Sequence, residues 1–443
     1  MNNIEYKGVW WLPGNSKNYI TGILSFNSDE GVYLELIGQL DSYDKYNIIL
    51  GRTSDGRKIT LYKCLEVNKT HNSNGFVTTR VFANIIFEGV HFNSDDDIKF
   101  SEISCHYSNL DEWAWMQGPS INVEKNKINI THEVPIKKSV QVNEKYDVEI
   151  YPDIEISPRC IVQKEASIIQ KIYLKVLNKE LDSFEEHMSQ LRHLQNFISL
   201  GVGKPIIPID IIGKTEINKE KFGERYFYPS VKIYFSIRKG LESDRVVLPP
   251  HMLFNLPKIG DDINIFLINW FERREILEPI INLYFGIIYN NHMYLEQKFS
   301  NLIQAIESYH RRTKLNAELD QSEHEERINS ILDSVDIKYS DWLRGRLSYS
   351  NEPTLRKRLN DMMSECNDIL NLSSRERKSF ITKVCNTRNY LTHYDISLAD
   401  KAAKNMELLE ICNKLKVIIE FYLLLEIGFN NEMAKNILNN KIR

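Results

Sequence analysis

The sequence predicts an α+β protein with a β-rich N-terminal part, a mixed middle part and an all-α C-terminal bundle. The chain has 443 residues, which is more than one ordinary hydrophobic core accommodates. Short runs of β-branched and aromatic residues recur early in the chain, whereas apolar residues at three-four spacing dominate its last third. We therefore expect a β-rich domain at residues 1–155, a mixed α/β region at 156–291 and a helical bundle at 292–443.

The expected strands of the N-terminal part are short apolar runs separated by turn residues. Asp55-Gly56 lies between two of these runs, and this pair is typical of a tight β-hairpin. The pattern favours an antiparallel sheet or a sandwich. The expected strands are 8–12, 19–26, 31–40, 47–51, 58–67, 78–87 and 99–107.

The middle region combines helical and extended patterns. Apolar residues at 181–198 follow three-four spacing and predict an amphipathic helix that ends near Gly203. The run at 226–237 is typical of a strand. Residues 263–289 form a long apolar helical stretch, in which Pro279 predicts either a kink or two abutting helices.

The C-terminal third contains little other than helical patterns joined by short connections, as a bundle requires. Ser373 and Glu376 have the spacing of a capping box and predict where one helix begins. Pro353 is expected in the first turn of another helix. Further apolar stripes lie at 295–309, 327–335, 354–370 and 402–427.

Composition excludes several classes of protein. The net charge of -4 argues against a generic polyanion binder, so any contact with nucleic acid requires a local concentration of basic residues. No apolar run approaches the roughly 18 residues of a membrane span, and no signal peptide is expected. The six cysteines show no CxxC spacing, which argues against zinc and for reduced thiols. We expect a cytoplasmic protein without a metal site or a cofactor.

The pattern that points most directly to chemistry is Arg388-Asn389 followed by His393. An arginine offers bidentate donors to a phosphate, and a histidine transfers protons near neutral pH. RNA carries its own nucleophile, the 2′-hydroxyl, so these two groups suffice for cleavage without a metal ion. The pattern predicts Arg388 and His393 as catalytic residues, with Asn389 holding the imidazole or donating to a phosphate oxygen. The ordinary alternative is an arginine and a histidine that stabilise the end of a helix.

The spacing leaves two geometries open. Five residues advance a helix by about 500°, so Arg388 and His393 would lie roughly 140° apart on a straight helix. Either the helix ends near His393 and the ring turns back, or a second copy completes the site across a two-fold axis. Asn389 stacks with His393, and Arg388 stacks with Thr392. We expect Thr392 and Tyr390 to support the site.

Two further groups of charged residues lie in and just after the helical stretch expected at 295–309. Glu307 and Arg311 are four residues apart, and a surface ion pair between them is the commoner outcome. The alternative is that Glu307 orients Arg388 or His393 from a neighbouring helix. The basic residues Arg311, Arg312 and Lys314 are candidates for contact with an RNA backbone, although such charges are as often a solvated helix face.

Three segments resemble a known family. Residues 387–393, Thr-Arg-Asn-Tyr-Leu-Thr-His, resemble the R-N-x-x-x-H signature of HEPN (higher eukaryote and prokaryote nucleotide-binding) helical domains. Residues 302–312 resemble the opening helix of the ApeA-like HEPN branch, and residues 8–13 look like the start of the domain that accompanies it. This resemblance implies a bacterial anti-phage protein that dimerises through its HEPN domain, cuts tRNA or other RNA after a phage-derived trigger, and causes abortive infection.

Other functions remain open at this stage. The helical domain is, in a second hypothesis, a non-catalytic RNA-binding or dimerisation module, with the β-rich domain as the recognition surface. Nucleotidyl transfer is a third option, and no nucleotide-binding motif supports it. The resemblance also implies that residues 1–155 sense the infection.

Overall fold

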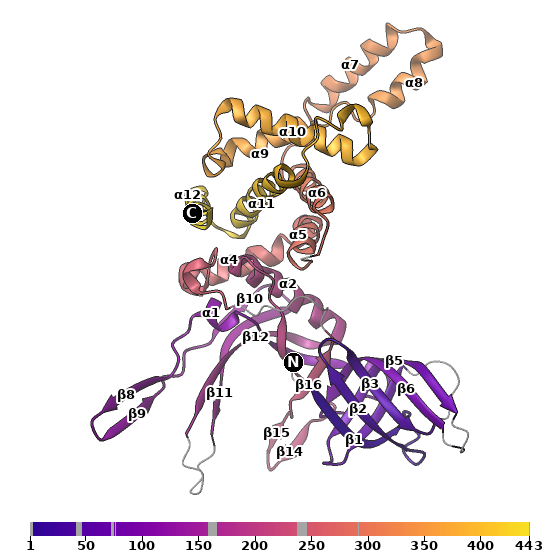
Figure 1. Cartoon of the computed structure of the whole chain (residues 1–443), viewed down its shortest axis with the longest axis vertical. Coiled ribbons are helices and arrows are strands. Elements are labelled where there is room, and N and C mark those ends of the chain that lie inside the picture. Colours follow the sequence, from indigo (N-terminus) through magenta and orange to yellow (C-terminus); the bar gives the residue numbers. More distant parts are fainter. Residues whose placement is uncertain are drawn as a thin grey trace. The chain divides into compact units, whose positions relative to one another are not determined.

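The computed structural model (Figure 1) describes residues 3–40, 47–71, 75, 77–157, 166–236, 246–290 and 292–442. The chain forms two compact units, Met1–Ile268 and Asn269–Arg443, and the division falls inside helix α4 (Ile263–Glu272). The first unit is rich in strands and the second is helical, which confirms the expected α+β class. Within the described residues, no helix is both long and apolar enough to cross a membrane.

The first six strands close into an antiparallel barrel in the order β1-β2-β3-β6-β5-β4, because β4 pairs again with β1. Closure leaves none of these strands as a free edge. All six lie where the sequence places them, with ends shifted by a few residues. Gly56 turns the chain between β4 and β5 with a φ of 89°, as the Asp-Gly pair predicts. Their bounds are β1 (Ile4–Trp11), β2 (Ile20–Asn27), β3 (Gly31–Ile37), β4 (Ile48–Thr53), β5 (Lys58–His71) and β6 (Val77–Glu88).

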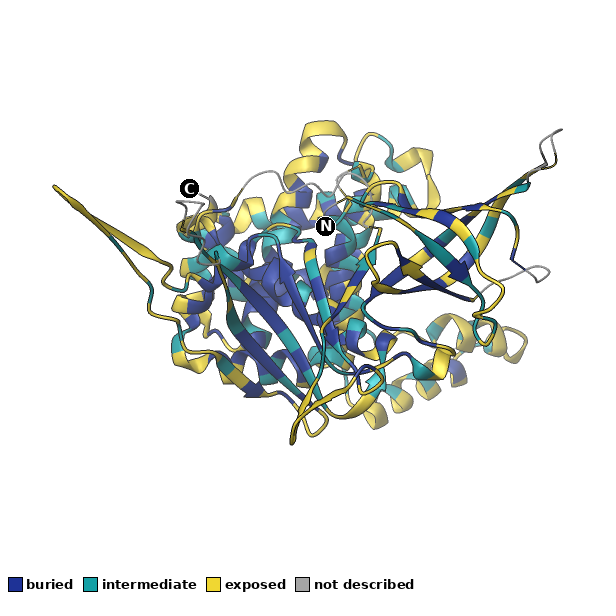
Figure 2. Ribbon diagram, turned by 90° about the horizontal axis from the view of Figure 1, so that it is seen from below, coloured by how far each residue is buried: buried dark blue, intermediate teal, exposed yellow. Residues whose placement is uncertain are grey.

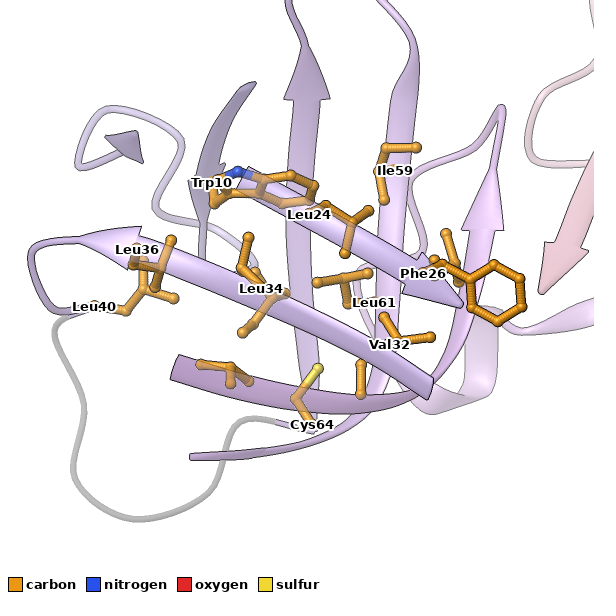
Figure 3. Packing of buried hydrophobic residues seen from close by; sticks show 14 residues of the cluster. Trp10, Leu24, Phe26, Val32, Leu34, Leu36, Leu40, Ile59, Leu61 and Cys64 are labelled. Carbon is orange, nitrogen blue, oxygen red and sulfur yellow. The ribbon is translucent and has the colours of Figure 1, made fainter. Parts of the chain in front are cut away.

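Trp10 fills the interior of the barrel (Figure 3). Its side chain is completely buried among aliphatic residues that include Leu24, Leu36 and Ile59. Gly51 lies beside the indole, and a Cβ atom built at this glycine would be 2.2 Å from the ring. Only glycine therefore lets strand β4 pass the indole, and the barrel interior depends on this pair.

The same sheet continues beyond the barrel as β16-β13-β7-β12-β11-β10. Strand β12 pairs with β11 on one side and with β7 on the other. The compact unit therefore runs through the boundary expected near residue 155, because strands from both sides of it share one sheet. The bounds are β7 (Lys99–Tyr107), β10 (Lys138–Gln141), β11 (Tyr146–Ile156), β12 (Ile168–Ser183), β13 (Pro208–Lys214) and β16 (Val231–Phe235).

Helix α2 (Phe184–Val202) packs on strands β12 and β7. Its N-cap is Ser183 and its C-cap is Gly203, whose φ is 76°. The predicted C-terminal end is thus correct, but the predicted start is wrong, because Leu181 belongs to strand β12. The short helices of this unit are α1 (Leu110–Ala114), α3 (Leu256–Ile259), η1 (Asp95–Asp97), η2 (Pro249–His251) and η3 (Gly260–Asp262).

Two hairpins stand apart from the large sheet. Strands β8 (Ser120–Glu124) and β9 (Lys127–Thr131) pair only with each other among the described residues, and almost every residue in them is exposed (Figure 2). Strands β14 (Glu220–Phe222) and β15 (Arg225–Phe227) form the second hairpin. The strand expected at 226–237 is interrupted at 228–230, between β15 and β16, and residue 237 lies outside the described residues.

The second unit is a bundle in which α6 packs against α5, α9, α10 and α11. Thr354 caps α9, so Pro353 precedes the helix and does not occupy its first turn as expected. Helix α11 is the most buried element of the bundle. The bounds are α5 (Arg274–Ile288), α6 (Leu295–Thr313), α7 (Gln321–Asp333), α8 (Ile337–Leu347), α9 (Leu355–Leu370), α10 (Ser374–His393), η4 (Ile396–Leu398), α11 (Asn405–Ile427) and α12 (Asn431–Ile442).

The long helix expected at 263–289 is two helices, but the break lies at Arg273 and not at Pro279. Proline has no N–H, so Pro279 leaves the carbonyl of Glu275 without its partner in the helix. Arg312 of α6 donates to this oxygen through Nη1 at 3.0 Å. This contact from a neighbouring helix explains how α5 continues through the proline.

A buried carboxylate ties three helices of the bundle together. Glu420 of α11 is 1% exposed and accepts hydrogen bonds from Tyr284 Oη at 2.7 Å and Lys441 Nζ at 3.1 Å. Lys416 Nζ lies 3.6 Å away. Burial alone raises the pKa of Glu420, but the two lysines and the tyrosine more than offset this and hold the pKa below its ordinary value. Glu420 is therefore ionised and paired at neutral pH.

Replacing Gly51 with alanine should destabilise the first unit by about 1–3 kcal/mol, because the new methyl group overlaps the Trp10 indole. Thermal unfolding of the full chain, followed by Trp fluorescence, measures this loss. Gly118→Ala is the matched control, since a Cβ atom there meets nothing within 4 Å. Equal unfolding temperatures for the two variants would contradict the proposed packing.

Glu420→Gln should destabilise the bundle by about 3 kcal/mol at pH 7, because Lys416 and Lys441 lose the buried counter-charge with which they pair. A carboxylate with a lowered folded-state pKa contributes stability above its unfolded pKa, and this contribution disappears as the pH falls through the folded pKa. The difference between wild type and Glu420→Gln should therefore shrink on acidification. Urea unfolding followed by helical circular dichroism at pH 7 and pH 4 tests this, and a pH-independent difference would contradict it.

Candidate active site

The candidate residues lie in the last turns of helix α10. The capping box expected at Ser373 and Glu376 begins this helix, with both reciprocal hydrogen bonds formed. His393 is the last helical residue, since Tyr394 adopts a left-handed conformation with a φ of 51°. The helix thus ends where the first of the two predicted geometries requires. His393 and Asn389 are exposed, whereas Arg388 is half-buried.

Arg388 is held by two side chains. Its Nη2 atom lies 3.6 Å from Glu307 Oε1 on α6, and its Nη1 atom donates to Asn389 Oδ1 at 3.3 Å. Thr392 Oγ1 donates to the Arg388 carbonyl at 2.7 Å. The ion pair is partly solvated, so it contributes at most about 1 kcal/mol to stability. Its main effect is on the direction in which the guanidinium points.

The surface pair expected between Glu307 and Arg311 does not form. Arg311 instead pairs with Glu352, at the beginning of the segment that leads into α9. The sequence spacing favoured the local pair, but α10 brings Arg388 to the same carboxylate. The alternative, in which Glu307 contacts Arg388 from the neighbouring helix, is the geometry that the structure has.

The other two basic residues proposed to bind RNA also have partners within the chain. Arg312 donates to the Glu275 carbonyl, and Lys314 pairs with Glu365 at 2.8 Å. With Arg311 bound to Glu352, the structure gives this cluster a local structural role. Contact between Arg311, Arg312 or Lys314 and RNA stays a prediction.

His310 of α6 is buried and is not available for proton transfer to a substrate. Its Nδ1 atom lies 3.1 Å from Arg358 Nη1, and its Nε2 atom lies 3.3 Å from Asp361. A guanidinium only donates, so Nδ1 must accept and the ring is neutral with its proton on Nε2. Burial lowers the pKa of His310, in agreement with a neutral ring. His310 therefore links α6 to α9.

Two groups near the motif have no clear signal in the sequence. Arg356 of α9 donates to Thr382 Oγ1 at 3.0 Å, which places a second arginine against α10. Cys385, one turn before Arg388, is half-buried, and burial raises its pKa while Arg356 and Arg388 act to lower it and Glu307 to raise it. Arg388 is three residues from Cys385 on the same helix, but Glu307 and Arg356 reach this thiol only through the packing of α6 and α9 against α10, which no sequence spacing shows.

Tyr390 faces a different part of the surface. It packs edge-to-face with Tyr394, with ring centroids 5.8 Å apart. Both rings line a pocket of about 550 Å³, together with residues from the start of α6 and from the segment before α11. Neither Arg388 nor His393 lines this pocket. Tyr390 thus lies beside the candidate site, and a supporting role for it stays a prediction.

Comparison with protein families finds two matches. Residues 5–270 match the model of ApeA N-terminal domain 1, and residues 300–433 match that of Apea-like HEPN. The first match covers more than half of the chain and nearly the whole first unit, and the second covers most of the helical unit. Both confirm the resemblance found in the sequence. Searches of curated proteins and of solved structures found no match.

The charges around Cys385 make a prediction that is independent of enzymatic activity. Glu307→Gln removes a negative charge near the thiol, which lowers its pKa and should speed alkylation of Cys385 at pH 8 by a few-fold. Arg388→Ala should slow it. Peptide mass spectrometry after brief iodoacetamide treatment measures the rates. Glu296→Gln, on the same helix but next to Cys412, is the control, and an equal change in both glutamate variants would contradict the arrangement.

Proposed function

The chain belongs to the family of ApeA-like HEPN proteins, and we propose that it is an anti-phage endoribonuclease that needs no metal ion. The family supports a defence HEPN protein, and the ribonuclease activity is our inference. The observation that carries it is the Arg388 guanidinium, oriented by Glu307, five residues before an exposed His393 at the end of α10. An oriented cation and a solvent-accessible imidazole are the two groups that metal-free RNA cleavage requires.

The proposed reaction is attack of a ribose 2′-oxygen on the adjacent phosphorus. His393 takes the 2′-hydroxyl proton, the bond between the 2′-oxygen and phosphorus forms, and the bond to the 5′-oxygen breaks. The leaving 5′-oxygen takes a proton, so the products carry a 2′,3′-cyclic phosphate and a 5′-hydroxyl. Arg388 offsets the negative charge that develops on the phosphoryl oxygens. The Asn389 side-chain oxygen accepts a hydrogen bond from Arg388 and so helps to position the guanidinium.

We propose that the working site contains two copies of the chain. Arg388 and His393 project about 140° apart on α10, so one copy directs them to different sides of the helix. HEPN domains typically dimerise, and a two-fold axis near the end of α10 would bring the Arg388 of each copy to the His393 of the other. A second histidine also supplies the acid that the leaving oxygen needs.

The proposed biological role is cleavage of tRNA or other RNA in the bacterial cytoplasm after a phage-derived trigger, which leads to abortive infection. We assign the sensing of infection to the first unit, which contains residues 1–155, and RNA cleavage to residues 292–443 of the second unit. The support is that the two family matches fall on separate compact units.

One observation favours a different function. Within the described part of the chain, no hydrogen bond orients the His393 ring, and Arg388 already has a carboxylate partner. A non-catalytic HEPN domain that binds RNA or dimerises is compatible with such a site, with the β-rich unit as the recognition surface. This second candidate predicts that phage protection survives the loss of both side chains.

His393→Ala should abolish new RNA ends in phage-infected cells, because the proton transfers lose their base; a loss of about 100-fold or more is expected. End-specific RNA sequencing of infected cells measures this, with His292→Ala as the control at an exposed histidine far along the chain. Discrete cyclic-phosphate ends in wild type and the control alone support the ribonuclease. If purified His393→Ala still cuts RNA and EDTA stops the cutting, the metal-free mechanism is contradicted. If infected cells with wild type and with His393→Ala have the same RNA ends and both resist phage, the non-catalytic module is favoured.

A further inference from the structure

One face of helix α10 is polar and mostly exposed, and its N-terminal part carries basic residues. The helix carries five lysine and arginine residues and a single acidic residue, Glu376, in a chain whose net charge is -4. Glu376 is engaged in the capping box. This helix therefore has the local concentration of positive charge that the overall composition lacks.

The exposed face is set by the apolar residues on the other side. The buried residues of the helix are Phe380, Ile381, Val384 and Thr387. Opposite them, at three-four spacing, a row of polar and basic residues faces outward. We call this row the α10 stripe, and it consists of Arg375, Lys378, Thr382, Asn386, Asn389 and His393.

Two cations of the stripe are free, whereas their neighbours are not. Arg375 and Lys378 are exposed, and neither forms an ion pair with any of the residues that the structure describes. Arg377 donates to Asn360 instead, and Lys383 pairs with Glu407 at 3.1 Å. The unpaired positive charge of the helix is thus concentrated on the stripe.

Arg356 adds a third cation to the middle of the row. It comes from α9 and reaches Thr382 through Nη1. The order along the helix is therefore Arg375, Lys378, Arg356 on Thr382, and finally the Asn389 and His393 pair beside Arg388. By contrast, Arg311, Arg312 and Lys314 are occupied by Glu352, the Glu275 carbonyl and Glu365.

We propose that the α10 stripe is the path along which a single strand of RNA lies on its way to His393. This inference rests on the proposed function, because it names the form of the substrate. The stripe spans 19 residues, from Arg375 to His393, or about 27 Å, which is long enough for a single strand of about four nucleotides or more. A free single strand also lets the 2′-oxygen, phosphorus and 5′-oxygen come into line for attack, which stacked duplex RNA resists. The substrate class is therefore an unpaired loop or tail.

The test is RNA binding by full-length protein in a His393→Ala background, measured by fluorescence anisotropy with a labelled 12-nucleotide single strand. Arg375→Gln/Lys378→Gln should weaken binding by about 20-fold at 0.1 M salt and should lower the slope of log K against log salt by about 1.4. Arg344→Gln/Arg346→Gln changes the same net charge on exposed residues of α8 and is the matched control. Arg356→Gln alone should lower the slope by about 0.7.

Each result decides a different point. Three results of the binding assay would overturn the inference. The stripe variant and the control could lose equal affinity, or the parent protein could fail to bind single-stranded RNA. The parent protein could also bind a blunt duplex of the same sequence more tightly than the single strand. A stripe variant that sediments as a smaller species than its parent would also overturn the inference, because the stripe would then be a subunit interface. If the stripe variant alone loses binding while wild type produces no cleavage, the path stands and the ribonuclease proposal fails. If wild type cleaves and both variants bind equally, only the path fails.

Discussion

The amphipathic burial of helix α10 is the constraint on which the candidate site depends. Phe380, Ile381 and Val384 enter the bundle, and this fixes the rotation of the helix about its axis. Thr387 completes the contact, because its hydroxyl accepts from the Ala403 N–H at 2.8 Å and ties the helix to the segment before α11. Once that side is buried, Asn389 and His393 must face outward and Arg388 must reach α6. The chemistry on one side of the helix is therefore a consequence of the packing on the other.

Buried charges stabilise the bundle around this helix, and they do so in a network whose members depend on one another. Arg358, which is 3% exposed, donates to His310 and to Asn316, and Glu352 accepts from Arg358 and pairs with Arg311. Burying an arginine costs free energy unless its donors are satisfied, and here each partner belongs to α6 or to the chain that leads from α6 to α9. Arg311 and Arg358 could bind a ligand as judged from the sequence, but in the structure their guanidinium groups pair with Glu352.

The first unit is held together by a closed barrel and a continuous sheet. Its six N-terminal strands close into a barrel around Trp10. The same sheet continues from β6 to β16 and ends at β10, and helix α2 packs against it. The family match at 5–270 corresponds to this continuous sheet. The β8–β9 hairpin leaves this sheet with Ile121, Val123 and Ile128 more than 60% exposed. A sensor in this unit, as proposed, would have a closed barrel as a rigid base and exposed hairpins at its periphery.

Local patterns in the sequence were sufficient for the α+β class, the seven N-terminal strands, the capping box at Ser373 and the end of α2 at Gly203, because each depends on residues close together in the chain. The family resemblance was also visible there, since residues 387–393 carry a signature of fixed spacing.

Tertiary structure decided three other features. Glu307 pairs with Arg388 and not with Arg311, the helix break lies at Arg273, and β12 joins the N-terminal sheet. In each case the deciding contact comes from an element distant in sequence: α10 brings a second arginine to α6, Arg312 satisfies the carbonyl that Pro279 leaves free, and β7 offers an edge to β12. Spacing along one helix or strand carries no information about such neighbours, whereas packing determines which charges remain free.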